Sequence, residues 1–363
     1  MKRTVIILLC ILVPFLGTTV FAQTIVIDHT CAQLEPMPAS AILQAKQMLH
    51  IAYAHTSHGS QIITGMTALI GQTNLKGYKG DIYRWNEGGG GGALDIDDYF
   101  IDGDLGHNGD VSWANPTRTY LDSHPDVNVV MYSWCGGCSD NTPQGIQTYL
   151  NQMNELEQEY PNVTFVYMTG HRDIWSDATL KANNQQIRDY CVANGKVLYD
   201  FADIESYNPD GMYYEFANDN CDYYSGPGTG YLGNWAEEWQ NTHTEGVDWY
   251  DCSPAHTKAL NGNLKAYAAW WLWCRLAGWE GHTGIDTYSQ NSIKLYPNPA
   301  TDKLSLEMPI TLLNSYVYIY NQPGQIVWQQ QITSEISVID VKRLKSGVYL
   351  LKTDVGVQKL IIR

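Results

Sequence analysis

The chain has few charged side chains, and most of them are acidic. Asp, Glu, Lys and Arg make up 17% of its 363 residues, and the net charge is −16. Because a nucleic-acid-binding protein usually presents a strongly basic surface, this balance argues against nucleic acid as a partner. Phenylalanine is also scarce, with 6 residues against 25 Tyr and 12 Trp. Aromatic side chains with a polar end suit wet binding surfaces, which fits a protein that stacks against sugars.

The chain also lacks a long apolar stretch beyond its first 22 residues, so we expect no transmembrane segment. Residues 1–22 have the order of a secretion signal: a basic start, an apolar core from Val5 to Phe15, and small residues at the end. The apolar core is too short to cross a bilayer comfortably. We therefore expect an exported protein whose mature chain begins near residue 23.

Seven cysteines follow the signal, and an odd number leaves at least one without a partner in the chain. An exported protein can hold disulfides. We expect at least one bond among two pairs, Cys135 with Cys138 and Cys221 with Cys252. The sequence around the first pair does not resemble a thioredoxin, which argues against a redox role. A four-cysteine zinc site would need a second closely spaced pair, which the sequence does not have.

Segments of strand and helix character alternate over most of the chain. Apolar runs typical of buried strands lie at residues 49–54, 127–132, 163–168 and 197–201, and residues 81–85 are a further predicted strand. Helical spacing or capping residues predict helices at residues 39–48, 61–71, 142–160, 180–194 and 263–277. This alternation predicts an α/β domain with a doubly wound parallel sheet.

Two further regions complete the predicted organisation. Residues 95–110 carry six aspartates and read as a long loop, which is either solvated or holds a structural calcium ion; we expect no other cofactor. After a polar linker at residues 281–291, short alternating strands predict a small β-sandwich. The expected regions are thus a signal (1–22), an α/β domain (23–280), the linker, and a β-sandwich (292–363).

Small polar residues follow the first predicted strand. In open α/β sheets, ligands bind outside the carboxyl ends of the strands, and a serine there with a histidine available is a candidate nucleophile. Ser57 is that serine, flanked by His55 and His58. The two histidines could also hold a metal, but no third ligand is evident, so we expect no metal. A polar turn with incidental histidines is the alternative.

His256 and Asp251 lie just before the last predicted helix. In a catalytic triad, the imidazole takes the proton of the nucleophile and the carboxylate fixes its tautomer. Ser57, His256 and Asp251 are therefore our candidate catalytic residues. A structural histidine at the start of the helix is the alternative for His256.

The oxyanion of an acyl-transfer intermediate needs hydrogen-bond donors. Candidate donor or substrate-binding positions are Gly88 and Gly89, within a run of five glycines, and Cys135 and Gly136 after the third strand. The glycine run could instead be a flexible loop. His171, after the fourth strand, could contact substrate or pack beneath it.

Ser133 is a rival nucleophile. It follows a buried strand and precedes Gly136, as in a nucleophile elbow. However, Met131 and Cys135 occupy the two positions at which the Gly-x-Ser-x-Gly pattern has glycine. The sequence leaves the choice between Ser57 and Ser133 open.

The C-terminal region resembles the sorting domain of the type IX secretion system of Bacteroidetes. The resemblance rests on Leu-Tyr-Pro-Asn-Pro-Ala at 295–300, Leu-Lys-Ser-Gly-Val-Tyr at 344–349 and Lys-Leu-Ile-Ile-Arg at 359–363. It implies export across the outer membrane by that machinery, followed by release or surface attachment.

The α/β domain resembles the SGNH-type (GDSL-like) hydrolases over roughly residues 45–280. That family has a flavodoxin-like sheet, with its nucleophilic serine after the first strand, where Ser57 lies, and its Asp and His before the last helix, where Asp251 and His256 lie. Here His-Thr-Ser at 55–57 replaces Gly-Asp-Ser, and no asparagine follows the third strand.

These features together predict a secreted serine esterase that removes acyl groups, such as O-acetyl, from an extracellular polysaccharide. One alternative is a polysaccharide lyase or glycoside hydrolase that uses His, Tyr and a carboxylate from Asp200, Asp203 or Glu205, because paired carboxylates across a cleft mark glycosidases. The other is a glycan-binding protein without catalysis, which would need the aromatics but neither Ser57 nor His256.

Overall fold

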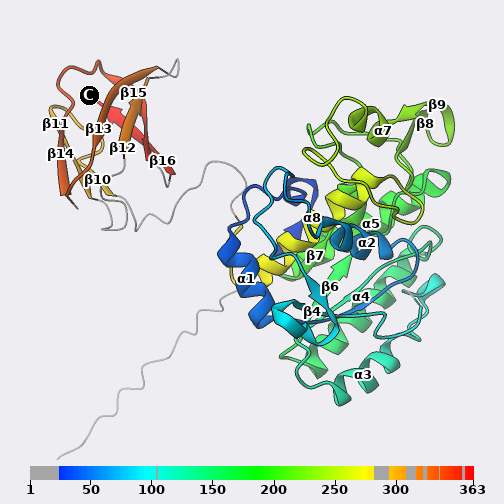
Figure 1. Ribbon diagram of the computed structural model, residues 1–363. Coiled ribbons are helices and arrows are strands. Elements are labelled where there is room, and N and C mark those ends of the chain that lie inside the picture. The colour runs from blue at the N-terminus through cyan, green and yellow to red at the C-terminus, as the bar shows by residue number, and fades with distance from the viewer. Residues whose placement is uncertain are drawn as a thin grey trace, which may run out of the picture. The chain divides into compact units, whose positions relative to one another are not determined.

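The computed structural model describes residues 24–281 apart from 104, and residues 294–363 apart from 308–315, 322–324, 335 and 354–355. The predicted signal and nearly all of the predicted linker lie outside the described residues. The chain divides into two compact units (Figure 1). The larger extends to Ala277 without residues 35–38, and the smaller comprises residues 35–38 and the chain from Gly278 onward. The division lies close to residue 280, the predicted end of the α/β domain.

The larger unit is built on a seven-stranded sheet in which every pair of neighbouring strands is parallel. Across the sheet the strands are β1 (Ile25–Ile27), β7 (Val197–Tyr199), β6 (Thr164–Met168), β5 (Val129–Tyr132), β2 (His50–Ala54), β4 (Leu94–Asp98) and β3 (Trp85–Asn86). All four residues of β5 and four of the five in β2 are buried, as the continuous apolar runs predict for central strands. The prediction of an α/β unit with a parallel sheet is confirmed.

Two strands of the parallel sheet were missed in the sequence. β1 lies in the stretch before the first predicted helix, and β4 lies where we expected an acidic loop. In β4, Leu94 and Ile96 are buried, and the aspartates between them find partners on neighbouring elements. Asp95 bonds His50, and Asp97 accepts a hydrogen bond from Tyr120. Because these carboxylates are paired, this segment forms a strand although its composition is typical of a loop.

Two groups of helices pack on the sheet, which lies between them in Figure 1. One group is α1 (Ala39–Met48), α2 (Ser60–Leu69) and α8 (Ala259–Leu276), and the other is α3 (Ala114–Ser123), α4 (Pro143–Glu159) and α5 (Asp177–Ala193). The Thr142 side chain caps α4 by accepting the Gly145 N–H, with Pro143 in the first turn, as predicted. α8 is buried almost throughout, including Trp270, Trp271 and Trp273.

Short elements complete the larger unit. They are η1 (His29–Cys31), η2 (Glu87–Gly92), η3 (His107–Gly109), η4 (Ile174–Ser176), α6 (Phe201–Ile204), α7 (Trp235–Gln240) and an antiparallel hairpin of β8 (Asp222–Gly226) and β9 (Thr229–Asn234). The hairpin and α7 belong to the long irregular region before α8, and they lie beside each other at the upper right of Figure 1.

The smaller unit contains two antiparallel sheets. One has the order β10 (Lys294–Tyr296), β11 (Lys303–Glu307), β14 (Ile336–Asp340), and the other β13 (Ile326–Gln331), β12 (Tyr316–Tyr320), β15 (Gly347–Thr353), β16 (Gly356–Ile362). Side chains from both sheets share one buried core, to which β11 contributes Leu304 and Leu306, and β12 contributes Val317 and Ile319. The prediction of strands in this region is confirmed, and the structure shows that they are antiparallel.

Candidate active site

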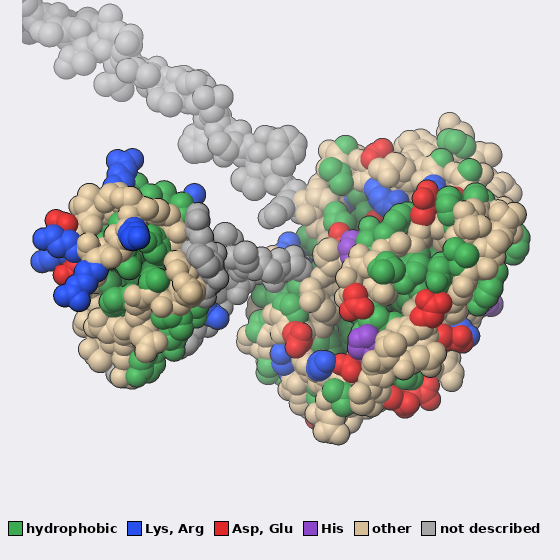
Figure 2. All heavy atoms as spheres, turned by 90° about the horizontal axis from the view of Figure 1, so that it is seen from above, with side chains coloured by type: hydrophobic (Ala, Val, Ile, Leu, Met, Phe, Trp, Pro, Cys, Tyr) green, Lys and Arg blue, Asp and Glu red, His purple; other side chains and the backbone are tan. Residues whose placement is uncertain are grey.

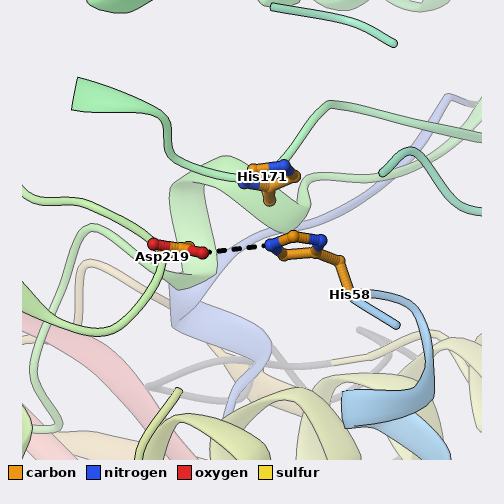
Figure 3. Close-up of side chains that lie close together, drawn as sticks. All are labelled: His58, His171 and Asp219. Carbon is orange, nitrogen blue, oxygen red and sulfur yellow. Dashed lines mark hydrogen bonds and ion pairs between the residues drawn. The ribbon is translucent and has the colours of Figure 1, made fainter. Parts of the chain in front are cut away.

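Three side chains form a hydrogen-bonded line at the carboxyl edge of the parallel sheet. The Cys135 sulfur lies 3.0 Å from His58 Nδ1, and His58 Nε2 lies 3.0 Å from Asp219 Oδ2. Figure 3 shows the His58–Asp219 bond, with His171 stacked on the His58 ring. A thiol, an imidazole and a carboxylate in this order are the parts of a nucleophile, its base and the group that orients the base.

The sheet places these residues together. β2 and β5 are adjacent, with Ala54 opposite Tyr132, so the loops that follow them emerge side by side. The first loop carries His58 and the second carries Cys135. The chain order reverses across this pair, because β4 follows β2 on one side and β6 follows β5 on the other. Ligands of open α/β sheets bind at such a switch point.

The charges of this line are set by its own hydrogen bonds. The bond from His58 lowers the pKa of the Cys135 thiol to about 6, against the opposing effect of partial burial. Burial lowers the pKa of His58, but its bonds to Asp219 and Cys135 outweigh burial and raise it to about 9. The pKa of Asp219 is lowered by its bond to His58, although burial opposes this. Near pH 7 the line therefore holds a thiolate, an imidazolium and a carboxylate.

His171 is a neutral neighbour of this ion pair. Its Nδ1–H donates to the Arg172 carbonyl at 2.9 Å, so Nε2 is the acceptor that takes the Gly136 N–H at 3.3 Å. Burial and the positive charge of His58 both lower the pKa of His171. The bond from Gly136 to His171 thus fixes the backbone just after Cys135.

His58, His171 and Asp219 could also be read as metal ligands, since one ligand atom from each lies within 4.8 Å of the others. A metal binds an imidazole nitrogen in the plane of the ring, and the two rings here are parallel, 3.6 Å apart and tilted by only 5°. No single position lies in both ring planes. The present arrangement therefore fits proton transfer better than metal binding.

The structure brings most of the predicted site residues together. The Ser57 hydroxyl lies 3.3 Å from the Cys135 sulfur, and His256 stacks on His58 with ring centroids 4.3 Å apart. Among the described residues, however, no hydrogen bond joins Ser57, His256 and Asp251 to one another. Asp251 and His256 are both exposed, and His256 has a left-handed backbone with φ +63°. The serine triad remains a prediction, and its hydrogen bonds are not formed in this structure.

The glycine run lies away from Ser57. Gly88 donates its N–H to Asp95 at 2.6 Å, and Asp95 pairs with His50, the first residue of β2. β2 runs from His50 to Ala54 and is roughly 13 Å long at about 3.3 Å per residue. Ser57 lies beyond its far end, after Ala54. β3 is a short edge strand that pairs with the beginning of β4. Gly88 and Gly89, which follow β3, are therefore at the opposite end of the strands from Ser57.

His55 and Ser133 are buried rather than open to a ligand. His55 Nε2 bonds Asp98 at 2.6 Å, and its ring lies against Tyr53 and Tyr99. Ser133 is 1% exposed and lies directly beneath Gly59. Of the two histidines in the predicted H-x-x-H pair, only His58 takes part in the hydrogen-bonded line.

The seven described cysteines are all free, which corrects the expected disulfides. Cys135 points toward Ser57 and His58, whereas Cys138 is buried with its sulfur 3.3 Å from Asn184 Oδ1. The Cys221 sulfur contacts the Thr257 hydroxyl, and the Cys252 sulfur contacts the Ala259 carbonyl. The members of each expected pair thus face different partners.

The carboxylates considered for a glycosidase are each held by a basic side chain. Asp200 pairs with Arg188, Asp203 with His29, and Glu205 with Lys265. The last pair is completely buried. These contacts make the three carboxylates part of the framework around the site.

Sequence reasoning missed Asp219 as a site residue. It lies in the long irregular region between α6 and α8, which has no period that would single out one carboxylate. The only signal is its setting in Asn218-Asp219-Asn220, a polar stretch between aromatic residues. Asn218 fixes the local turn, because its side-chain oxygen accepts the Asp222 N–H at 3.0 Å.

Comparison with known families accounts for the C-terminal unit. Residues 294–363 match the model of the secretion system C-terminal sorting domain. These residues are a type IX secretion sorting domain. The protein is therefore secreted through the type IX system to the cell surface or the extracellular space, and the secretion machinery is a partner. No curated protein matches the chain. Among the described residues, no helix has the length and apolar character needed to cross a membrane.

Solved structures with some similarity to this chain include two proteins. One is PorZ, described as an essential bacterial surface component of the type-IX secretion system of Porphyromonas gingivalis, with 18% identity over 22% of this chain and 13% of that chain, and a TM-score of 0.17. The other is a double mutant of the Cellulomonas fimi endo-β-1,4-mannanase, with 11% identity over 75% of this chain and 55% of that chain, and a TM-score of 0.19. This chain spans less than two thirds of either protein.

Proposed function

We propose that this protein is a secreted acyl-ester hydrolase that uses Cys135 as its nucleophile, His58 as its acid and base, and Asp219 to orient His58. The observation that carries the proposal is the hydrogen-bonded line from the Cys135 sulfur through His58 to Asp219. A thiolate is the reactive form of cysteine, and the hydrogen bond from His58 favours it near neutral pH.

The reaction has two steps. In the first, the Cys135 thiolate attacks the carbonyl carbon of the ester, and His58 Nδ1–H protonates the departing alkoxide, which leaves as the alcohol. A thioester on Cys135 and a neutral His58 remain. In the second, His58 takes a proton from water as the water oxygen attacks the thioester, and the thiolate leaves with release of the carboxylic acid.

Ser57 has two possible roles in this proposal. Its hydroxyl, 3.3 Å from the sulfur, can donate a hydrogen bond that stabilises the thiolate, and this contact also lowers the pKa of Cys135. The alternative, predicted by the SGNH resemblance, is that Ser57 itself is the nucleophile. The geometry favours Cys135, because its sulfur contacts an imidazole nitrogen directly.

An SGNH-type, flavodoxin-like architecture is part of the proposal. The central strands have the order β4-β2-β5-β6-β7. This corresponds to the 2-1-3-4-5 order of flavodoxin-like sheets if β2 is counted as the first strand. We likewise propose that the two antiparallel sheets of the smaller unit form a β-sandwich. The proposed substrate is an acylated polysaccharide, since export directs the enzyme to extracellular polymers and its composition favours sugar stacking.

Alanine variants of Cys135, Ser57 and His58 test the proposal on 4-nitrophenyl acetate and on O-acetylated xylan. We expect Cys135→Ala and His58→Ala to lose roughly 10⁴–10⁶-fold in kcat, as nucleophile and triad losses do. Ser57→Ala should lose less than about tenfold, in line with one modest hydrogen bond to the sulfur. Mass spectrometry of the acid-quenched enzyme should find the acyl group on the Cys135 peptide.

The converse results favour other functions. Full activity of Cys135→Ala together with an inactive Ser57→Ala would restore the serine mechanism. Unsaturated sugar ends without acetate release would indicate a lyase, and binding of glycan without turnover of either substrate would indicate a binding protein.

A further inference from the structure

The loop that supplies Asp219 continues into a hairpin that carries exposed aromatic rings. Tyr231 on β9 is 61% exposed, and Trp175 on η4 is 75% exposed. Large apolar rings gathered at a surface are a mark of ligand-binding sites. In Figure 2, hydrophobic side chains lie next to acidic ones on the face of the larger unit that is in view.

Trp175, Tyr224 and Tyr231 form one connected group, which we call the aromatic platform. The centroids of Trp175 and Tyr224 are 6.5 Å apart with the planes at 62°, and those of Tyr224 and Tyr231 are 5.8 Å apart at 76°. The rings thus contact edge to face, and the outer two present most of their surface to solvent. Such rings can stack on the C–H faces of sugar units.

The platform is held in a defined geometry. A Cβ at Gly228 would lie 2.7 Å from Cζ3 of the Trp175 indole, so the indole rests directly on the hairpin turn. Gly228 also has φ +63°, a conformation that favours glycine. The backbone N–H of Trp175 donates to the Asp173 carboxylate at 3.0 Å, which fixes the backbone of η4. A rigid aromatic surface loses little conformational entropy when a ligand binds.

The platform is tied to the proposed active site by Arg172. This buried residue lies between His171 and the η4 segment, and its guanidinium donates to the Glu215 and Ala217 carbonyls in the loop that leads to Asp219. Ala217 in turn forms a β-bridge with Tyr223 of the hairpin. One framework therefore positions His171 and Asp219 in the site and Trp175 and Tyr224 outside it.

The charge of this region indicates which ligand it accepts. The hairpin at residues 222–234 contains no Lys or Arg, and two carboxylates beside it, Asp222 and Glu238, form no ion pair among the described residues. An anionic polysaccharide, such as one rich in uronic acids, would meet electrostatic repulsion here. A neutral polysaccharide would not.

We propose that the aromatic platform is a binding subsite for a neutral polysaccharide chain, which it holds so that an acylated sugar reaches Cys135. The position of the acyl group rests on the proposed function, but binding to the platform does not require catalysis. The platform determines the polymer class, and the line of Cys135, His58 and Asp219 performs the chemistry.

Affinity electrophoresis of the full chain tests the subsite. A Cys135→Ala background prevents turnover, and the gels contain xylan or glucomannan as neutral probes and polygalacturonate as an anionic one. The background variant should be retarded by a neutral probe and not by polygalacturonate. Adding Trp175→Ala or Tyr231→Ala should weaken this binding about tenfold or more, as loss of a central aromatic contact does.

Two further variants complete the test. Gly228→Ala keeps all three rings but displaces Trp175, so it should also weaken retardation. Tyr316→Ala removes an exposed tyrosine of the smaller unit and should leave retardation unchanged. Far-ultraviolet circular dichroism confirms folding of each variant.

The outcomes separate this inference from the proposed function. Unchanged migration of the background variant in all three gels, retardation only by polygalacturonate, or retardation that survives the Trp175 and Tyr231 changes would each overturn the subsite, whatever the hydrolysis assays show. Retardation that depends on these rings supports the subsite even if no ester is cleaved.

Discussion

The rings of His58 and His171 lie parallel with their centroids 3.6 Å apart, and their surroundings raise the pKa of His58 but lower that of His171. His58 donates to a sulfur on one side and a carboxylate on the other, which stabilises its cation. His171 donates one N–H to a carbonyl and accepts an N–H at its other nitrogen, which requires the neutral ring. The stack thus joins an imidazolium to a neutral imidazole and avoids repulsion between two cations.

This assignment predicts a bell-shaped dependence of kcat/KM on pH. Activity should fall below about pH 6, where the Cys135 thiolate takes up a proton, and above about pH 9, where His58 loses one. Asp219→Asn removes the carboxylate that raises the pKa of His58, so the alkaline limb should move to lower pH. The acid limb should move to higher pH because a less charged His58 stabilises the thiolate less. Limbs that do not move in Asp219→Asn would contradict the role of Asp219.

The cysteines give a second prediction that needs no substrate. Burial raises the pKa of the other described thiols, for example to about 11 for Cys31 and about 12 for Cys138, whereas that of Cys135 is lowered to about 6. Iodoacetamide at pH 7 should therefore label Cys135 before any other described cysteine. His58→Ala should slow this labelling. Peptide mapping measures it, and preferential labelling of Cys138 or Cys252 would contradict the assignment.

The strands that the sequence predicts well are those buried on both faces. β2, β5, β6 and β7 lie within continuous apolar runs, and their positions agree with the predicted ones to within a few residues. β4 was missed because aspartates alternate with its buried side chains, and their partners, such as Tyr120 for Asp97, are distant in the sequence. Pairing between distant residues is what a one-dimensional pattern cannot show.

The same limit applies to the candidate site. Ser57, His58, Cys135 and His171 were predicted as site residues because each follows a strand, and they do gather at one edge. The direction of the Cys135 sulfur could not be predicted, since Cys138 is an equally good partner by spacing alone. Gly88 was expected at this edge from chain order, but strand register places it at the opposite end.

Chelation distinguishes the two readings of His58, His171 and Asp219. If the group acts through proton transfer, dialysis against EDTA and then addition of Zn²⁺ should leave esterase activity unchanged or lower it, because Zn²⁺ competes for the thiolate and imidazole. Restoration of lost activity by Zn²⁺ would instead identify a metal site. The measurement is acetate release from the same enzyme sample before dialysis, after it, and after addition of the metal.

A buried ion pair connects the loops around the site. Lys265 of α8 and Glu205 lie 2.5 Å apart and are both inaccessible to solvent. Lys265 also donates to Gln61 of α2, whose own amide donates to the Ala255 carbonyl next to His256 at 2.5 Å. The second oxygen of Glu205 accepts the backbone N–H of Arg172 at 2.7 Å. Through these bonds, one pair holds the backbone on both sides of His58.

Lys265→Met should therefore be strongly destabilising, because it leaves the Glu205 charge buried without its partner. Loss of one member of a buried pair typically costs about 3–5 kcal/mol, which corresponds to a fall in Tm of roughly 6–20 °C for a unit of this size. Lys265→Met combined with Glu205→Gln should recover much of this loss, since the amide introduced by the second change is neutral and could still accept the Arg172 N–H. Thermal unfolding followed by tryptophan fluorescence reports mainly on the larger unit, which contains most of the tryptophans. A double variant less stable than Lys265→Met alone would show that the carboxylate is tolerated without the lysine, and that the network is held by its other hydrogen bonds.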